Sequence, residues 1–100
     1  MPPKEGHDPV EQVHVIVTGK VQGVFFRKHT EKIGVSLGLA GWVRNLDDGT
    51  VEILAQGPRS LLLQLVQWAH RGSPKSKVES VTPQYTQTFD ASLQKFAVQR

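Results

Sequence analysis

Alternating apolar and polar residues near the start of the chain predict a β-strand. Val13, Val15 and Val17 occupy every second position, which is the side-chain period of a strand with one buried face. Ile16 makes the opposite face partly apolar, so we expect this strand to lie inside a sheet. The segment that follows, residues 19–23, contains two glycines and is too short and glycine-rich for regular structure.

A helical spacing of apolar residues comes after these glycines. Phe26, Ile33 and Leu37 fall on one stripe of a helix, and Gly38 is placed to end it. Gly34 inside the helix costs about 1 kcal/mol relative to alanine. We therefore expect this helix to depend on packing against the rest of the protein.

The middle of the chain predicts a hairpin and then a second helix. Residues 40–46 and 50–56 have strand patterns, and the Asp48-Gly49 pair between them is typical of a hairpin turn. Gly57-Pro58 opens the helix, with the proline in its first turn. The helix ends before residues 72–74, and its apolar stripe consists of Leu62, Leu65, Val66 and Ala69.

Two more strands complete the predicted order of elements. Residues 78–86 and 95–99 have strand patterns, and Pro83 in the former favours a sheet edge or a bulge. The order β-α-β-β-α-β, with a short extra strand, favours an α+β fold: a ferredoxin-like sandwich with an antiparallel sheet and two helices on one face. Residues 1–9, with three prolines, are interpreted as a flexible tail, and residues 10–100 as one domain.

Composition narrows the classes of protein that the chain can be. It has 100 residues, 38% of them hydrophobic and 21% charged, a net charge of +3 and no cysteine. The lack of cysteine excludes disulfides, thiolate metal sites and a cysteine nucleophile. No apolar run approaches the ~20 residues of a membrane helix, and the first residues do not resemble a signal peptide. We therefore expect a cytoplasmic protein, a monomer by default, with no membrane partner.

The glycine segment between the first strand and the first helix is a candidate anion site. A strand, a glycine loop and a helix in succession point backbone N–H groups toward an anion, although the two glycines taken alone favour a plain turn over such a site. Arg27, Lys28 and His29 then fall in the first helical turn, where the helix dipole disfavours cations by about 0.3–1 kcal/mol each. We interpret Lys28 and His29 as solvated. The planar fork of Arg27 suits phosphate oxygens.

Asn45 is the second candidate residue. If the first helix is a crossover, the strands on either side of it run parallel, and Asn45 ends the second of them at the same sheet edge as the glycine loop. It shares a face with Val43, which is expected to point toward the helices. On this geometry alone, a role in a site and a role as the first residue of the hairpin turn remain equally open. The Asp47-Asp48 pair is interpreted as part of that turn and the four histidines lack metal-ligand spacing, so no metal is expected.

Two separated motifs resemble those of the acylphosphatase family. The first is Gly19-Lys20-Val21-Gln22-Gly23-Val24-Phe25-Phe26-Arg27. The second is Gly41-Trp42-Val43-Arg44-Asn45 with Asp48-Gly49-Thr50-Val51-Glu52. The ending, residues 96–100, is similar to the family's last strand but lacks its frequent terminal tyrosine. The resemblance covers residues 10–100, and the absent aromatic puts only packing or stability in question.

The resemblance implies an enzyme that hydrolyses acyl phosphates to a carboxylate and inorganic phosphate, without metal, cofactor or covalent intermediate. It implies that the phosphoryl group is held by the Arg27 side chain and by the backbone of Gln22, Gly23, Val24, Phe25, Phe26 and Arg27. Asn45 would orient the attacking water, and inorganic phosphate would be both product and inhibitor.

Two other functions remain as alternatives to the enzyme. RNA-recognition modules share this order of elements but stack bases on aromatics of their central strands. Residues 13–18 and 50–56 contain none, so no nucleic-acid partner is expected. The other alternative is a catalytically idle regulatory domain of the same fold, which the presence of both Arg27 and Asn45 disfavours.

Overall fold

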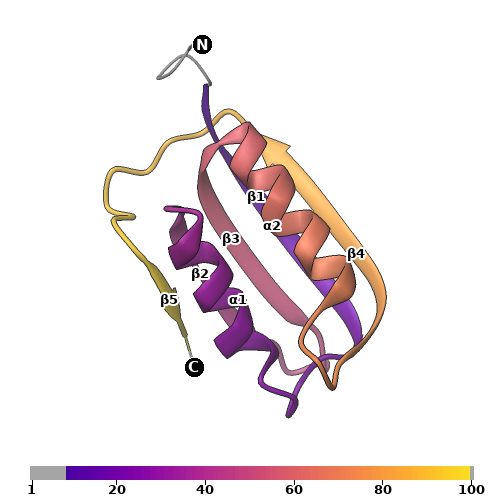
Figure 1. The fold of residues 1–100 in the computed structure, drawn as a ribbon. Helices are drawn as coiled ribbons and strands as arrows, with labels where there is room; N and C mark the ends of the chain where they lie inside the picture. The colour runs from indigo at the N-terminus through magenta and orange to yellow at the C-terminus, as the bar shows by residue number, and fades with distance from the viewer. Residues whose placement is uncertain (1–8, 100) are drawn as a thin grey trace.

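The computed structural model describes residues 9–99, which form five strands and two helices (Figure 1). In chain order these are β1 (Val10–Lys20), α1 (Phe26–Ser36), β2 (Ala40–Asn45), β3 (Val51–Pro58), α2 (Arg59–Arg71), β4 (Lys77–Thr86) and β5 (Phe96–Val98). The predicted order of elements is confirmed. The predicted tail, residues 1–9, lies outside the described residues apart from Pro9.

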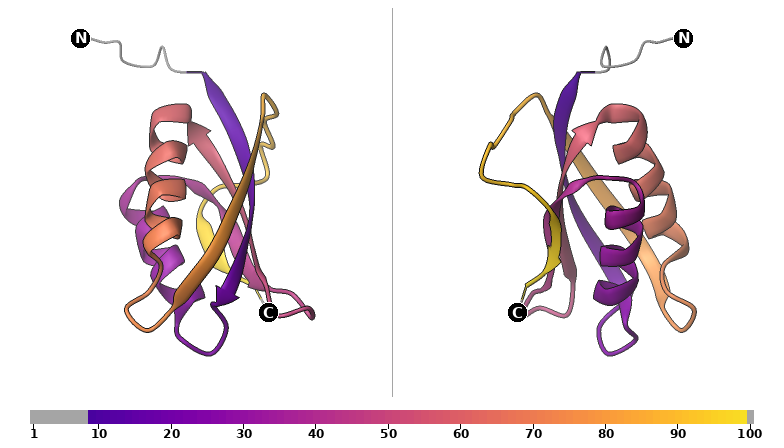
Figure 2. Two further views of the ribbon diagram at one scale, coloured as in Figure 1. Left: turned by 90° about the vertical axis from the view of Figure 1, so that its right-hand side faces the viewer. Right: turned by 60° about the vertical axis from the view of Figure 1, so that its left-hand side comes forward.

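The strands form one sheet in the order β4-β1-β3-β2-β5, and both helices cover the same face of it (Figure 2). The predicted antiparallel pairing is confirmed for β4 with β1, β1 with β3, and β3 with β2. The short β5 is the exception, because it pairs parallel with β2 and makes the sheet mixed. β1 and β2 run in the same direction, as expected of strands joined by a crossover helix, with β3 between them.

The core lies between the sheet and the helices, and its members alternate along the strands as the sequence predicts. Val13, Val15 and Val17 of β1 are fully buried, as are Ile53 of β3 and Val43 of β2. The α2 stripe is buried as well and consists of Leu62, Leu65, Val66 and Ala69. Burying these side chains supplies the main favourable free energy of folding.

Glycine and proline positions explain three local details. A Cβ on Gly34 would lie 2.6 Å from the Phe96 ring, so the absence of a side chain allows α1 to pack on β5. Pro83 lies on β4, which is an edge strand, as predicted. Pro58, in contrast, is the last residue of β3 and the N-cap of α2, with ψ of 140°. The helix therefore begins one residue later than the sequence suggests.

Candidate active site

The loop between β1 and α1 has an unusual backbone. Gly23 has φ of 74° and Phe25 has φ of 61°, so both adopt the left-handed conformation. The side chains of Val24 and Phe26 on either side are buried, whereas the Phe25 side chain is 73% exposed. A bulky residue in this conformation is strained by about 1–3 kcal/mol, and such strain persists only where the surroundings impose it.

The loop's backbone N–H groups are available to a ligand. Within the described part of the chain, no hydrogen bond takes up the N–H groups of residues 23–27. Two of the loop's carbonyls, in contrast, are occupied. Val24 O accepts from Ser73 Oγ at 2.9 Å, and Phe25 O accepts from His29 N at 3.1 Å. Free donors at the N-terminus of α1 form a favourable place for an anion.

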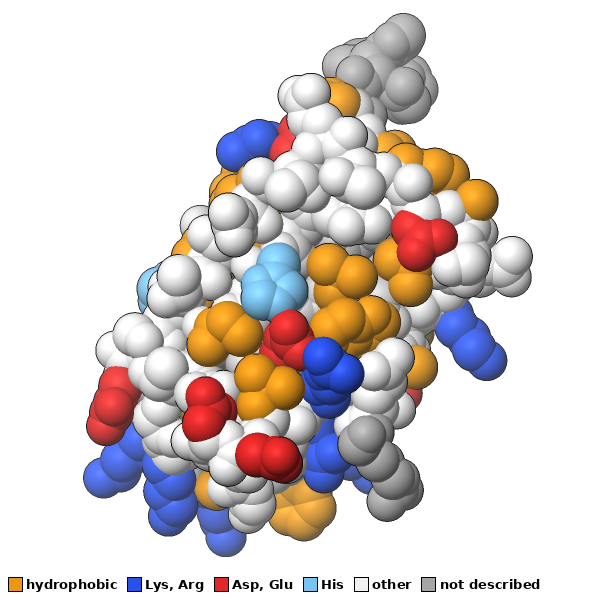
Figure 3. All heavy atoms as spheres, turned by 180° about the vertical axis from the view of Figure 1, so that it is seen from behind, with side chains coloured by type: hydrophobic (Ala, Val, Ile, Leu, Met, Phe, Trp, Pro, Cys, Tyr) orange, Lys and Arg blue, Asp and Glu red, His pale blue; other side chains and the backbone are white. Residues whose placement is uncertain are grey.

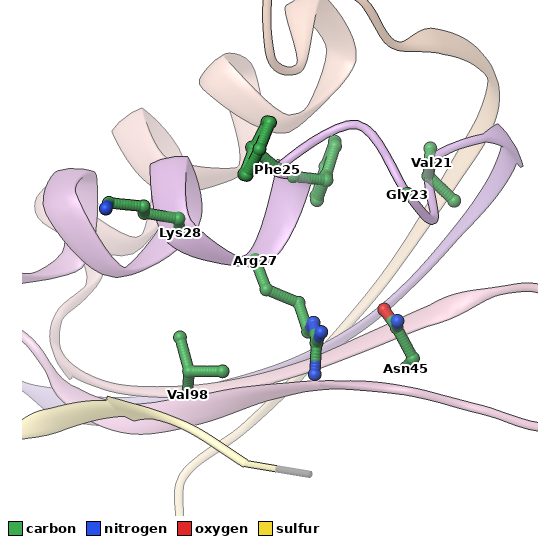
Figure 4. A pocket seen from close by; sticks show the side chains of 8 residues that line it. Val21, Gly23, Phe25, Arg27, Lys28, Asn45 and Val98 are labelled. Atoms are coloured by element: carbon green, nitrogen blue, oxygen red, sulfur yellow. The ribbon is translucent and has the colours of Figure 1, made fainter.

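Arg27 and Asn45 meet at one cavity below this loop (Figure 4). The cavity measures about 370 Å³ and is lined by Val21, Gly23, Phe25, Phe26, Arg27, Lys28, Asn45 and Val98. Arg27 reaches down from α1 toward the sheet, where its Nη1 donates to Gln99 O at 3.2 Å. Gln99 N donates in turn to Val43 O at 2.8 Å, so the segment after β5 holds the guanidinium near the end of β2.

Asn45 presents an unused acceptor to this cavity. It is the last residue of β2, pairs with Val51 of β3 and lies on the helix side of the sheet, as its shared face with Val43 predicts. Its Oδ1 is buried and has no hydrogen-bond partner among the described residues. A buried polar atom left unpaired costs about 1–3 kcal/mol, so this oxygen suits a hydrogen-bond donor that enters the cavity.

The Gln22 side chain makes a connection that the sequence did not predict. Its Nε2 donates to Leu46 O and to Thr50 O, both at 2.8 Å. These carbonyls belong to the turn between β2 and β3, directly after Asn45. A glutamine in a glycine loop carries no sequence signal for such a contact, because its partners lie 24 and 28 residues away. Gln22 therefore fixes the loop relative to Asn45.

The prediction that Lys28 and His29 are both solvated holds for Lys28 and is wrong for His29. His29 Nδ1 lies 2.9 Å from Phe25 O, so this ring supports the loop backbone. Lys28 is exposed and lines the rim of the cavity. Three consecutive basic residues thus have three different surroundings, which helical position alone does not distinguish.

The Asp47-Asp48 segment forms the predicted turn. Asp48 Oδ1 accepts from Thr50 N at 3.0 Å and from Thr50 Oγ1 at 2.6 Å, and these hydrogen bonds lower the pKa of the Asp48 carboxyl. Among residues 9–99, no group of three His, Asp or Glu side chains is arranged to hold a metal ion. No helix in the same range is long and apolar enough to cross a bilayer.

The fold and the cavity together define a small α+β protein in which the first βα loop, with its unpaired N–H groups, meets an arginine and an asparagine at one cavity. The acylphosphatase family model matches residues 13–98, and the chain belongs to the acylphosphatase family. It is accordingly an enzyme that hydrolyses acyl phosphates.

Individual relatives agree with this assignment over most of the chain. An acylphosphatase of Trichormus variabilis is 42% identical over 100 residues, covering 100% of this chain and 97% of the relative. One from Natronomonas pharaonis is 49% identical over 74 residues, covering 74% and 80%. The crystal structure of acylphosphatase from Bacillus subtilis has a TM-score of 0.86 and 39% identity, covering 90% of this chain and 99% of the other.

Proposed function

We propose that the backbone of residues 22–27 and the Arg27 side chain hold the phosphoryl group of the acyl phosphate, and that Asn45 orients the attacking water. The observation that carries this proposal is the meeting at one cavity of free N–H groups, a guanidinium and an unpartnered Asn45 Oδ1. The donors match the phosphoryl oxygens, and the acceptor matches an O–H of water.

The reaction proposed for this arrangement needs neither metal nor cofactor. Water attacks phosphorus, a new P–O bond forms, and the bond between phosphorus and the carboxyl oxygen breaks. A carboxylate leaves readily without a strong general acid. The remaining demand is to stabilise charge on the phosphoryl oxygens, where each preorganised donor contributes about 3 kcal/mol. An amide is not a strong base, so the proton of the water passes to the substrate's own phosphate.

The proposal also covers inhibition by the product, the oligomeric state and the cellular compartment. Inorganic phosphate carries the same oxygens as the substrate, so it should bind the loop and inhibit. We also propose that the enzyme acts as a monomer, the default state of a domain of this size, and in the cytoplasm, a compartment that a chain without cysteine is compatible with.

The open face of the sheet does not favour RNA as a partner. His14 of β1 and Glu52 of β3 meet there at 2.6 Å, and Arg44 Nε of β2 lies 2.6 Å from the same carboxylate. Figure 3 shows a histidine, an acidic and a basic side chain gathered in the middle of this face. The guanidinium of Arg44 also lies 4.9 Å from the centre of the Trp42 ring. The arginine and the tryptophan of this face are thus occupied with neighbours, and the acidic Glu52 opposes phosphate binding.

Replacement of the guanidinium tests the proposed function most directly. Arg27→Gln should lower kcat/KM for acetyl phosphate at least about 100-fold and weaken inorganic phosphate binding, with the circular dichroism spectrum unchanged. Lys32→Gln, on the exposed side of the same helix, is the matched control for lost charge. All assays include a chelator. Activity near wild type in Arg27→Gln, or loss of wild-type activity with the chelator, would refute the proposal.

A further inference from the structure

A buried serine from a distant part of the chain supports the loop from behind. We propose that Ser73 is a positioning residue for the reaction, because its hydroxyl sets the orientation of the Val24–Phe25 peptide and so directs the Phe25 N–H toward the phosphoryl group. This inference rests on the proposed function of the loop. It assigns a role to Ser73, which lies 49 positions after Val24, the residue whose carbonyl it binds.

Ser73 is itself firmly placed. It is 3% exposed and lies just after the end of α2. Its carbonyl accepts from Ser76 N at 3.0 Å and from Ser76 Oγ at 2.7 Å, which closes the segment into a tight turn. Gly72 before it has φ of 75°, and a Cβ there would lie 2.3 Å from Ser76 Oγ and 3.1 Å from the Phe26 ring. The turn therefore packs directly under the start of α1.

The geometry of a peptide group transmits this placement to the loop. The C=O and N–H of a trans peptide point in opposite directions, and the described chain has no cis bond. With Val24 O bound to Ser73 Oγ at 2.9 Å, the Phe25 N–H must point away from Ser73. His29 acts in the same way one peptide later, because it binds Phe25 O and thereby orients the Phe26 N–H.

The strained conformation of Phe25 explains why the loop needs a hydrogen bond of this kind. With φ of 61° and a side chain 73% exposed, Phe25 gains little from burial, so its strained backbone depends on the hydrogen bonds made to the carbonyls of the loop. Loss of the hydrogen bond to Val24 O would let the peptide rotate to a more relaxed state. The Phe25 N–H would then lose its alignment, while the rest of the fold stayed intact.

The experiment compares Ser73→Ala and Ser73→Cys with wild type. Cysteine fills nearly the same space but is a weak donor, so it separates hydrogen bonding from packing. We expect kcat/KM for acetyl phosphate to fall about 10- to 100-fold in Ser73→Ala and measurably in Ser73→Cys. Ser36→Ala is the control, since it removes a similar hydroxyl-to-carbonyl bond, Ser36 Oγ to Ile33 O, at the far end of α1.

The NMR resonances of the loop amides give a second measurement, which would not change if Ser73 had only a structural role. Titration with inorganic phosphate should shift the Phe25 and Arg27 amide resonances in wild type, and only the Arg27 resonance in Ser73→Cys. Wild-type kcat/KM and a wild-type Phe25 response in Ser73→Cys would overturn the inference, even if Ser73→Ala does not fold. The two failures are distinguishable: a failure of the proposed function leaves Arg27→Gln active, whereas a failure of this inference alone leaves Arg27→Gln inactive and Ser73→Cys active.

Discussion

Two glycine-containing loops meet beside the cavity, and they are stabilised in opposite ways. The turn between β2 and β3 bonds to itself: Leu46 N donates to Thr50 O at 2.9 Å, and Gly49 N donates to Leu46 O at 3.1 Å. The loop between β1 and α1 is held from outside, by Ser73 at Val24 O and by the contacts of the Gln22 side chain with the turn.

The difference shows how a loop can be both rigid and receptive. A turn that pairs its own N–H groups has few donors left for a ligand. The β1–α1 loop is fixed through its carbonyls and through one side chain, so its N–H groups stay unpaired within the described structure. The β2–β3 turn, which directly follows Asn45, accepts the hydrogen bonds from the Gln22 side chain.

The largest effect is expected at Asn45, which precedes the β2–β3 turn and faces the same cavity as the β1–α1 loop. Asn45→Ala removes the proposed water acceptor, so kcat for acetyl phosphate should fall about 100- to 1,000-fold. The N–H groups and Arg27 stay in place, and the affinity for inorganic phosphate should change little. Initial rates and phosphate inhibition constants measure the two quantities. A collapse of phosphate affinity would make Asn45 a binding residue and would contradict its role in positioning water.

The next effect concerns the connection between the loops. Gln22→Leu removes both hydrogen bonds to the turn, and the free energy of unfolding should fall by about 1–3 kcal/mol. kcat/KM should also fall about 10-fold, because the loop and Asn45 lose their fixed separation. Urea unfolding and acetyl phosphate hydrolysis test these outcomes, with Gln64→Leu on the exposed face of α2 as the control. Equal activity in both variants would show that the connection affects stability alone.

Substitutions at one glycine of each loop separate the effect of backbone strain on stability from its effect on activity. Gly23 and Gly49 have φ of 74° and 92°, and a Cβ would meet nothing within 4 Å at either position. Alanine should therefore cost about 1 kcal/mol of stability at both. Only Gly23→Ala should lower kcat/KM, since it alone alters the donors of the loop. Thermal unfolding and rate measurements on the pair decide this, and equal rates would mean that the loop tolerates a shift of its backbone.

The two loops also differ in how much the sequence predicts. Asp48 and Gly49 form a local turn, and local chemistry between strand patterns was enough to predict it. The valines of β1 likewise predict a buried strand from their spacing alone. Arg27 and Asn45 are indicated by helix polarity and strand parity, and the structure brings both to one cavity.

The residues that hold the β1–α1 loop could not be found in this way. Ser73 and Gln22 act on partners far along the chain, and neither stands in a pattern that marks its role. The position of His29 in the first turn of α1 does not reveal that its ring contacts Phe25 O, whereas the side chain of the neighbouring Lys28 is exposed. Such contacts depend on how the elements pack, which periodicity does not encode.

The smallest effect tests whether the β2–β3 turn is purely structural. Hydrogen bonds from Thr50 lower the pKa of Asp48 below its usual 3.8, so the ionised carboxyl favours the folded state above that pH. This contribution is lost as the pH falls through the lowered pKa. Asp48→Asn keeps an acceptor oxygen but removes the charge. Its Tm should therefore lie slightly below wild type at pH 6 and approach it toward pH 3, with kcat/KM unchanged at pH 6. A loss of activity comparable to that of Gly23→Ala would show that the turn takes part in catalysis and would remove the contrast between the two loops.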